Sequence, residues 1–124
     1  DILYLALPET PETKNLINHG RLNLLKSSCG IVNIGRQSVV DYDALCEKLT
    51  SNKLAGAILD VFEPEPIEAG SKLWDTPNLV ITPHVSSDDG ESYVRLTLEL
   101  FIKNLKLFIE NKTLVNQIDK KLGY

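Results

Sequence analysis

The sequence predicts an α/β fold with a parallel sheet and helices packed on it. Four short apolar runs, typical of strands, occupy residues 2–7, 30–35, 55–61 and 79–82. Segments with helical spacing separate the first three runs, and polar residues follow each run. Such alternation of strands and helices is typical of a parallel sheet with right-handed crossovers.

The composition fits a soluble globular domain that has no nucleic-acid partner. The 124 residues are 43% hydrophobic and 24% charged, and the net charge of −4 provides no basic surface. No apolar run is long enough to cross a membrane and no signal peptide is visible, so we expect a cytoplasmic location. The chain lacks methionine and a strand-like run starts at residue 2, so we expect a piece of a longer protein.

The first run, residues 2–7, has no polar alternation, which is typical of a strand buried on both faces. Prolines at positions 8 and 11 make the following segment a loop. Thr10 before Pro11 predicts the cap of a short helix with Leu16 inside. Gly20 is expected to end that helix, and the next leucines predict a second short helix on the sheet. Those leucines are Leu22, Leu24 and Leu25.

The second run, residues 30–35, is predicted to be a strand flanked by glycines. The phosphate-loop interpretation fails because the lysine is absent and the intervening residues are mostly β-branched. Asp41 predicts the N-cap of the next helix, which carries Leu45 and Leu49 on one face and ends at residues 51–52. Cys29 and Cys46 are too few for a disulfide framework or a zinc site, and we expect two small buried hydrophobes and no metal.

The third and fourth strands, at 55–61 and 79–82, are joined by an irregular connection. Glu63 and Glu65 each precede a proline, which disfavours helix. Trp74 in this connection is expected to pack over a sheet end. Asp88 and Glu91 then predict a capping box for a long helix that reaches about Glu110.

Two apolar stripes run along this last helix. The first stripe contains Val94, Leu98, Phe101, Leu105 and Phe108, and the second contains Leu96, Leu100 and Leu107. Two stripes indicate burial on two sides. Four strands cannot cover both, so we expect a second domain or subunit against this helix.

Charged side chains follow three of the predicted strands. Arg36 follows the second strand, Asp60 and Glu65 follow the third, and His84 follows the fourth. Ligands of open parallel sheets bind at the carboxyl ends of the strands. A carboxylate beside a histidine suggests an acid/base pair, and the planar fork of an arginine suits a substrate with adjacent carboxylate and carbonyl oxygens.

Four motifs in order resemble the C-terminal part of a D-isomer-specific 2-hydroxyacid dehydrogenase. They are PETPET at 8–13, NIGR at 33–36, DVFEPEP at 60–66 and TPH at 82–84. The resemblance implies half of a doubly wound, Rossmann-type sheet. It makes residues 1–87 the C-terminal half of a nucleotide-binding domain. Residues 88–124 become an interdomain helix and tail that lead to a mostly missing substrate domain.

The resemblance also implies a function: hydride transfer between NAD or NADP and a small 2-oxo or D-2-hydroxy acid. Its catalytic arginine, glutamate and histidine match Arg36, Glu65 and His84. Glu65 is the match because it lies five residues after Asp60, which excludes Glu63. The parent protein is then expected to be a homodimer.

Asp60 matches the family aspartate that binds the nicotinamide carboxamide. Weaker cofactor matches are Pro8, Thr10, Glu12, Ile34 and Ser86. Gln37 replaces the usual glycine after the arginine, and Ser87 and Asp88 replace small residues. The sequence has no G-x-G-x-x-G turn, so the choice between NAD and NADP stays open, and the isolated chain is expected to be inactive.

A second interpretation belongs to a different functional class. Some relatives in this family are transcriptional corepressors that use the fold as a nucleotide-gated interaction module and can keep the catalytic triad. The presence of Arg36, Glu65 and His84 therefore does not exclude a non-enzymatic role. Turnover by the full-length protein would favour the oxidoreductase, whereas binding of a peptide partner would favour the interaction module.

Overall fold

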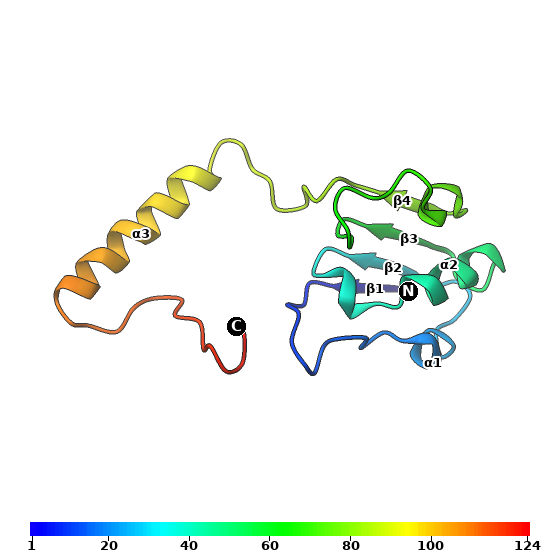
Figure 1. The fold of residues 1–124 in the computed structure, drawn as a ribbon, viewed down its shortest axis with the longest axis horizontal. Helices are drawn as coiled ribbons and strands as arrows, with labels where there is room; N and C mark the ends of the chain where they lie inside the picture. The colour runs from blue at the N-terminus through cyan, green and yellow to red at the C-terminus, as the bar shows by residue number, and fades with distance from the viewer. The chain divides into compact units, whose positions relative to one another are not determined.

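The computed structural model describes all 124 residues, and the chain forms two compact units (Figure 1). The first unit is Asp1–Ser86 and the second is Ser87–Tyr124. The sheet and all the predicted catalytic residues lie in the first unit.

Four parallel strands form one sheet, in the spatial order β1-β2-β3-β4 (Figure 1). The strands are β1 (Ile2–Leu5), β2 (Gly30–Asn33), β3 (Gly56–Leu59) and β4 (Leu79–Ile81). This confirms the predicted α/β class and parallel sheet. Each strand is shorter than its apolar run, and most of the difference lies at the carboxyl end.

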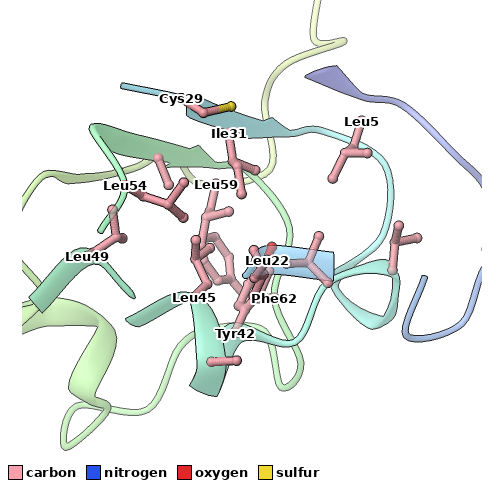
Figure 2. Close-up of a cluster of buried hydrophobic side chains, with 14 residues drawn as sticks. Leu5, Leu22, Cys29, Ile31, Tyr42, Leu45, Leu49, Leu54, Leu59 and Phe62 are labelled. Atoms are coloured by element: carbon pink, nitrogen blue, oxygen red, sulfur yellow. The ribbon is translucent and has the colours of Figure 1, made fainter. Parts of the chain in front are cut away.

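Helices α1 (His19–Leu22) and α2 (Tyr42–Thr50) pack together over one face of this sheet. The strands follow one another in a single direction across the sheet, so right-handed crossovers place every connection on the same face. Figure 2 shows the resulting core, where side chains from the helices meet side chains from the strands. They include Leu22, Leu45 and Leu49 from the helices and Leu5, Ile31 and Leu59 from the strands.

The opposite face of the sheet is exposed. Tyr4, Ile58 and Val80 are 60%, 42% and 54% exposed, and they alternate with buried or half-buried neighbours. The prediction that the first strand is buried on both faces is therefore wrong for this chain. The single direction of the crossovers is the physical reason, since it leaves no segment of the first unit to cover that face.

The segment after β1 forms hydrogen-bonded turns where a helix was predicted. Thr10 does act as a cap, since its carbonyl accepts hydrogen bonds from the backbone N–H groups of Thr13 (3.2 Å) and Lys14 (3.0 Å). Asn15 then adopts a positive φ of 53°, which ends the helical path. Ile17 instead makes a parallel bridge to Val40.

Gly20 does not end a helix but lies inside α1. The side chain of Asn18 caps this helix by accepting a hydrogen bond from the backbone N–H of Arg21. Leu22 is buried as expected, whereas Leu24 is 83% exposed and does not pack on the sheet.

Helix α2 begins and ends as the sequence predicts. The Asp41 side chain accepts a hydrogen bond from the N–H of Ala44 at 3.0 Å. At the other end, Asn52 takes a positive φ of 55° and donates to the Leu49 carbonyl, while Lys53 donates to the Lys48 carbonyl. This pattern is a Schellman motif with asparagine in the left-handed position.

The connection between β3 and β4 is irregular around residues 63–66, as predicted. It contains one short 3₁₀ helix, η2 (Lys72–Asp75), which is capped by Ser71. Trp74 in this helix donates its indole N–H to the Glu68 carbonyl at 2.9 Å and stays half exposed. It lines an apolar hollow beside Glu65 and His84, so its ring lies near the sheet end.

The second unit is built on α3 (Tyr93–Ile109). The helix starts later than predicted, because the Asp89 side chain accepts the N–H groups of Glu91 and Ser92 and forms a turn there. The side chain of Asn104, within this helix, exchanges two hydrogen bonds with the backbone of Val115 in the following segment.

No residue of α3 is fully buried. The first apolar stripe and Leu96 are exposed, whereas Leu100 and Leu107 of the second stripe are half-buried. A domain or subunit that covers these stripes stays a prediction. No helix of the chain has the length and apolar character that a membrane span requires.

Gly35 supplies a test of the packing at the carboxyl edge. A Cβ at this position would lie 2.5 Å from the Leu7 carbonyl oxygen and 2.7 Å from the Leu7 nitrogen. We expect Gly35→Ala to lower the free energy of unfolding by about 1–3 kcal/mol, measured by urea unfolding followed by circular dichroism.

The matched control is Gly70→Ala, because nothing lies within 4 Å of its added Cβ. It should change the free energy of unfolding by less than about 0.5 kcal/mol. Equal stability of the two variants would contradict the close approach of the segment after β1.

Candidate active site

His84 lies just after β4 in an unusual backbone conformation. Its φ is 57°, and its N–H donates to the Thr82 carbonyl at 3.0 Å across Pro83. A residue with a Cβ pays roughly 1–2 kcal/mol to adopt this left-handed conformation. The surrounding structure must therefore hold His84 in place.

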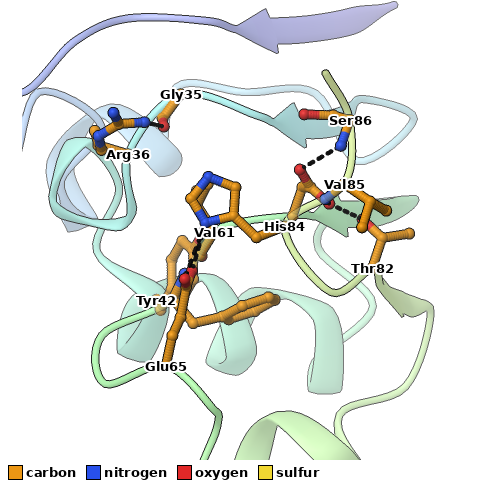
Figure 3. A network of polar contacts seen from close by, with 11 residues as sticks. Gly35, Arg36, Tyr42, Val61, Glu65, Thr82, His84, Val85 and Ser86 are labelled. Atoms are coloured by element: carbon orange, nitrogen blue, oxygen red, sulfur yellow. Dashed lines mark hydrogen bonds and ion pairs between the residues drawn. The ribbon is translucent and has the colours of Figure 1, made fainter. Parts of the chain in front are cut away.

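The carboxylate of Asp60 provides that hold. Asp60 follows β3 and is fully buried. Its two oxygens accept the backbone N–H groups of Val85 and Ser86, each at 2.9 Å, and the hydroxyl of Thr82 (Figure 3). These partners lie on both sides of His84 in the sequence, so the carboxylate fixes the backbone that presents the imidazole.

Two opposing effects act on the Asp60 carboxyl. Burial favours its neutral form and would raise its pKa, but the hydrogen bonds from Thr82, Ser86 and Val85 favour the anion. The hydrogen bonds outweigh burial, so the pKa of Asp60 is held well below its usual range. The loop therefore keeps a charged carboxylate beneath it at every ordinary pH.

Glu65 and His84 form the predicted carboxylate–imidazole pair. The Oε2 and Oε1 atoms of Glu65 lie 2.9 and 3.2 Å from Nδ1 of His84. Oε1 also accepts the N–H of Phe62 at 2.7 Å, which orients the carboxylate. The bond to His84, aided by that from Phe62, lowers the pKa of Glu65. Glu65 is thus an anion that orients the ring and leaves Nε2 available.

Arg36 completes the set. It follows β2, is exposed, and has no carboxylate partner; its Nη1 donates to the Gly35 carbonyl at 2.8 Å (Figure 3). Arg36, Glu65 and His84 line one hollow of about 450 Å³. The structure therefore brings the three predicted catalytic residues together. Glu9 and Lys14, which sequence reasoning did not single out, also line this hollow.

A buried polar network behind the hollow was missed by the sequence analysis. The Asn33 side chain donates to the Arg36 carbonyl and to the Tyr42 hydroxyl, both at 3.1 Å. The Tyr42 hydroxyl donates to the Val61 carbonyl at 2.8 Å. Burial raises the pKa of Tyr42, so this hydroxyl stays protonated. The sequence feature that could have indicated this network is the tyrosine directly after the Asp41 cap, at the first position of α2.

The weaker cofactor matches fall into two places. Ile34 and Ser86 lie at the carboxyl edge, after β2 and in the loop that Asp60 holds. Pro8, Thr10 and Glu12 lie in the turns after β1, where Thr10 is buried and donates its hydroxyl to Glu12. These three do not line the hollow that contains Arg36.

No group of three or more His, Cys, Asp or Glu residues is arranged to hold a metal ion. Cys29 and Cys46 are free and buried, as predicted. The site is thus an arginine, a carboxylate and an imidazole at the edge of a parallel sheet.

Residues 1–86 match the sequence model of the D-isomer specific 2-hydroxyacid dehydrogenase NAD binding domain. The chain belongs to this family. The resemblance carried by the four motifs is confirmed, and so is the assignment of the sheet to a nucleotide-binding fold.

The chain is also similar to curated proteins and to solved structures of this family. The chain is 36% identical to the glyoxylate reductase of Aeropyrum pernix over 122 residues, which covers 98% of this chain and 36% of the relative. A D-isomer specific 2-hydroxyacid dehydrogenase from Xanthobacter autotrophicus Py2, crystallised with NADPH and MES, superimposes with a TM-score of 0.91. That structure is 37% identical, and the match covers 99% of this chain and 50% of that one.

A third relative is an NADPH-dependent glyoxylate/hydroxypyruvate reductase from Sinorhizobium meliloti, crystallised with NADP and sulfate. It matches with a TM-score of 0.89 and 33% identity, over 100% of this chain and 40% of that structure. The chain thus spans between a third and a half of the length of these relatives.

The role of Asp60 as the support of the His84 loop can be tested by Asp60→Asn. The amide keeps the shape but places an N–H₂ donor against backbone donors, so we expect a loss of about 1.5–3 kcal/mol in the free energy of unfolding. Because the folded-state pKa of Asp60 is lowered, its contribution is present above the unfolded pKa of about 4. It is lost as the pH falls below that value.

The measurement is urea unfolding between pH 7 and pH 3, and the Asn variant should lose less stability than the parent over that range. The control is Asp88→Asn, since Asp88 is exposed and makes no hydrogen bond. A parent and an Asp60→Asn variant with parallel pH dependence would contradict this role.

Proposed function

We propose that this chain forms the catalytic edge of an oxidoreductase that interconverts a small 2-oxo acid and its D-2-hydroxy acid with NAD or NADP. The observation that carries the proposal is the Glu65–His84 pair facing the same hollow as the unpaired Arg36. A fixed cation and a proton donor in one hollow fit the two polar groups of a 2-oxo acid. Family membership supports the same chemistry.

Arg36 binds the substrate in this proposal. Its guanidinium is planar and always charged, and it donates several parallel hydrogen bonds. It can therefore hold the carboxylate and the adjacent carbonyl oxygen at once, which orients the substrate carbon that reacts. Its single intramolecular bond, to the Gly35 carbonyl, leaves other donors available.

His84 handles the proton. Its Nδ1 is taken by Glu65, so Nε2 is the atom that donates a proton to the carbonyl oxygen during reduction and removes it during oxidation. Glu65 stabilises the protonated imidazole and fixes the ring. The bond from Phe62 N–H keeps Glu65 in place while the charge on the ring changes.

The nicotinamide cofactor, when bound, supplies or accepts the hydride. Ile34 follows β2 and the loop 82–86 follows β4, so both lie at the carboxyl edge of the sheet, where such a group would bind. Ser86 and the neighbouring backbone offer hydrogen bonds to a carboxamide. Asp60, which is enclosed, supports this site by fixing Val85 and Ser86, and its Oδ2 accepts a single backbone N–H there.

The partners and location of the whole protein are also proposals. A homodimer with a second domain against α3 is supported by the exposed apolar residues of that helix. The net charge of −4 argues against nucleic acid as a partner. The guanidinium of Arg36, which faces the hollow without a carboxylate partner, supports a small carboxylic acid as the substrate. A cytoplasmic enzyme of this kind needs no membrane span.

The experiment is turnover by the full-length protein that contains this sequence. We expect reduction of glyoxylate, hydroxypyruvate or pyruvate with NADH or NADPH, followed at the absorbance of the reduced cofactor. The 124-residue chain alone serves as the control and should be inactive. Cofactor binding without turnover on any 2-oxo acid, together with specific peptide binding, would favour the interaction-module alternative.

Replacing His84 tests the proton donor. In the full-length protein, His84→Ala should lower kcat about 10²–10⁴-fold and leave the cofactor dissociation constant unchanged.

Arg36→Lys should raise KM for the acid and lower kcat together, because an ammonium cannot make two parallel hydrogen bonds. Steady-state kinetics and cofactor titration measure both effects, and full activity of either variant would contradict the assigned role.

Glu65→Gln tests the partner of the imidazole. The amide keeps the shape but removes the charge that favours the imidazolium, so reduction should be lost at lower pH than in the parent. Oxidation, which needs the neutral ring, should suffer less. Glu63→Gln is the matched control, since this residue makes no bond to His84. Sensitivity at Glu63 and silence at Glu65 would overturn the assignment.

A further inference from the structure

The hydroxyl of Tyr42 lies at a junction between the two halves of the candidate site. Tyr42 is only 7% exposed, although it is the first residue of α2. Its hydroxyl accepts from the Asn33 side chain at 3.1 Å and donates to the Val61 carbonyl at 2.8 Å. One bond reaches the end of β2 and the other the end of β3.

On the β2 side, the network leads to Arg36. The Asn33 side chain donates to the Arg36 carbonyl at 3.1 Å and accepts the Gly35 N–H at 3.1 Å. Asn33 is fully buried, so these bonds have no water to replace them. They set the backbone from which the guanidinium projects into the hollow.

On the β3 side, the network leads to Glu65 and His84. Val61 stands between Asp60, which holds the backbone around His84, and Phe62, whose N–H holds Glu65. The Tyr42 ring also packs edge-on against Phe62, with centroids 6.2 Å apart at 71°. In Figure 3, Tyr42 is seen below Val61.

We propose that Tyr42 is a positioning residue whose hydroxyl sets the placement of Arg36 relative to the Glu65–His84 pair. The proposal rests on the function proposed above. The substrate needs its carboxylate on Arg36 and its carbonyl oxygen at His84 simultaneously, so this placement governs reaction. No other side chain bonds both to the end of β2, which precedes Arg36, and to the segment after β3, which precedes Glu65.

The hydroxyl is separable from the ring. Tyr42→Phe keeps the packing on Phe62 but leaves the Val61 carbonyl and one Asn33 N–H buried without a partner. Unpaired buried groups force the backbone to shift toward other partners. A displacement of about 1 Å at a reacting group costs up to about 10²-fold in rate.

The test uses the full-length protein with Tyr42→Phe. We expect kcat/KM for the 2-oxo acid to fall about 10- to 100-fold, with a raised KM and reduction lost at lower pH. The cofactor dissociation constant should not change. The control is Tyr93→Phe, because Tyr93 is exposed and its hydroxyl makes no hydrogen bond.

A double-mutant cycle separates positioning from general destabilisation. If Tyr42 acts through the Glu65–His84 pair, Tyr42→Phe should shift the pH profile little further in a Glu65→Gln background. A merely structural effect would add fully to that of Glu65→Gln. Thermal unfolding of each variant confirms that assays are run on folded protein.

If Tyr42→Phe is unfolded at the assay temperature, Asn33→Asp breaks the same path by replacing both N–H donors with an acceptor, and the same rise in KM is expected. A second readout needs no turnover. Oxalate, titrated calorimetrically onto the protein with cofactor, presents adjacent carboxylates to Arg36, and Tyr42→Phe should weaken it about 10-fold.

The outcomes distinguish the two proposals. If the unsubstituted protein binds oxalate but turns over no 2-oxo acid, the proposed function is overturned. The oxalate affinity of Tyr42→Phe then still tests the positioning role. Unchanged oxalate affinity and unchanged kcat/KM in Tyr42→Phe, in a parent that is active, overturn the positioning role alone.

Discussion

The Asp60 carboxylate is the interaction on which the candidate site depends. It is an anion in the interior, and backbone and hydroxyl donors of residues 82–86 stabilise it. Those same bonds stabilise a loop in which His84 takes a left-handed conformation that is unfavourable for a histidine. The same hydrogen bonds therefore offset both the cost of burying the Asp60 charge and the cost of the left-handed conformation of His84. Asp60 thus fixes, from the interior, the backbone that carries the imidazole, and Glu65 then orients the ring.

The topology of the sheet explains why the site gathers at one edge and why one face stays open. Parallel strands direct all their carboxyl ends to the same side, so residues far apart in the sequence meet there. The unidirectional strand order places both helices on one face and leaves Tyr4, Ile58 and Val80 exposed. The sheet is thus half of a doubly wound arrangement. This agrees with the length of the match, which covers 50% and 40% of two solved relatives.

Much of this could be predicted from local patterns. The apolar runs located the strands, the Asp41 cap located α2, and the motif spacing selected Glu65 over Glu63. Predictions from local patterns failed where a non-glycine residue adopts a positive φ, and where the residue that caps a helix was not recognised in the sequence. Asn15 stopped a helix that Thr10 and Pro11 favoured, and Gly20 was accepted inside a short helix capped by Asn18.

The sequence by itself determined the class of fold and the family, and it singled out Arg36, Glu65 and His84 as the candidate catalytic residues, because apolar runs and motifs are recognised without knowing which segments pack together. Only the tertiary structure decided how these side chains are held. The bonds from Asp60 to residues 85–86, and from Tyr42 to β2 and β3, join segments that are distant in sequence. Buried polar groups find such partners only when the strands have come together, since burial makes an unpaired group costly and thereby selects the pairing.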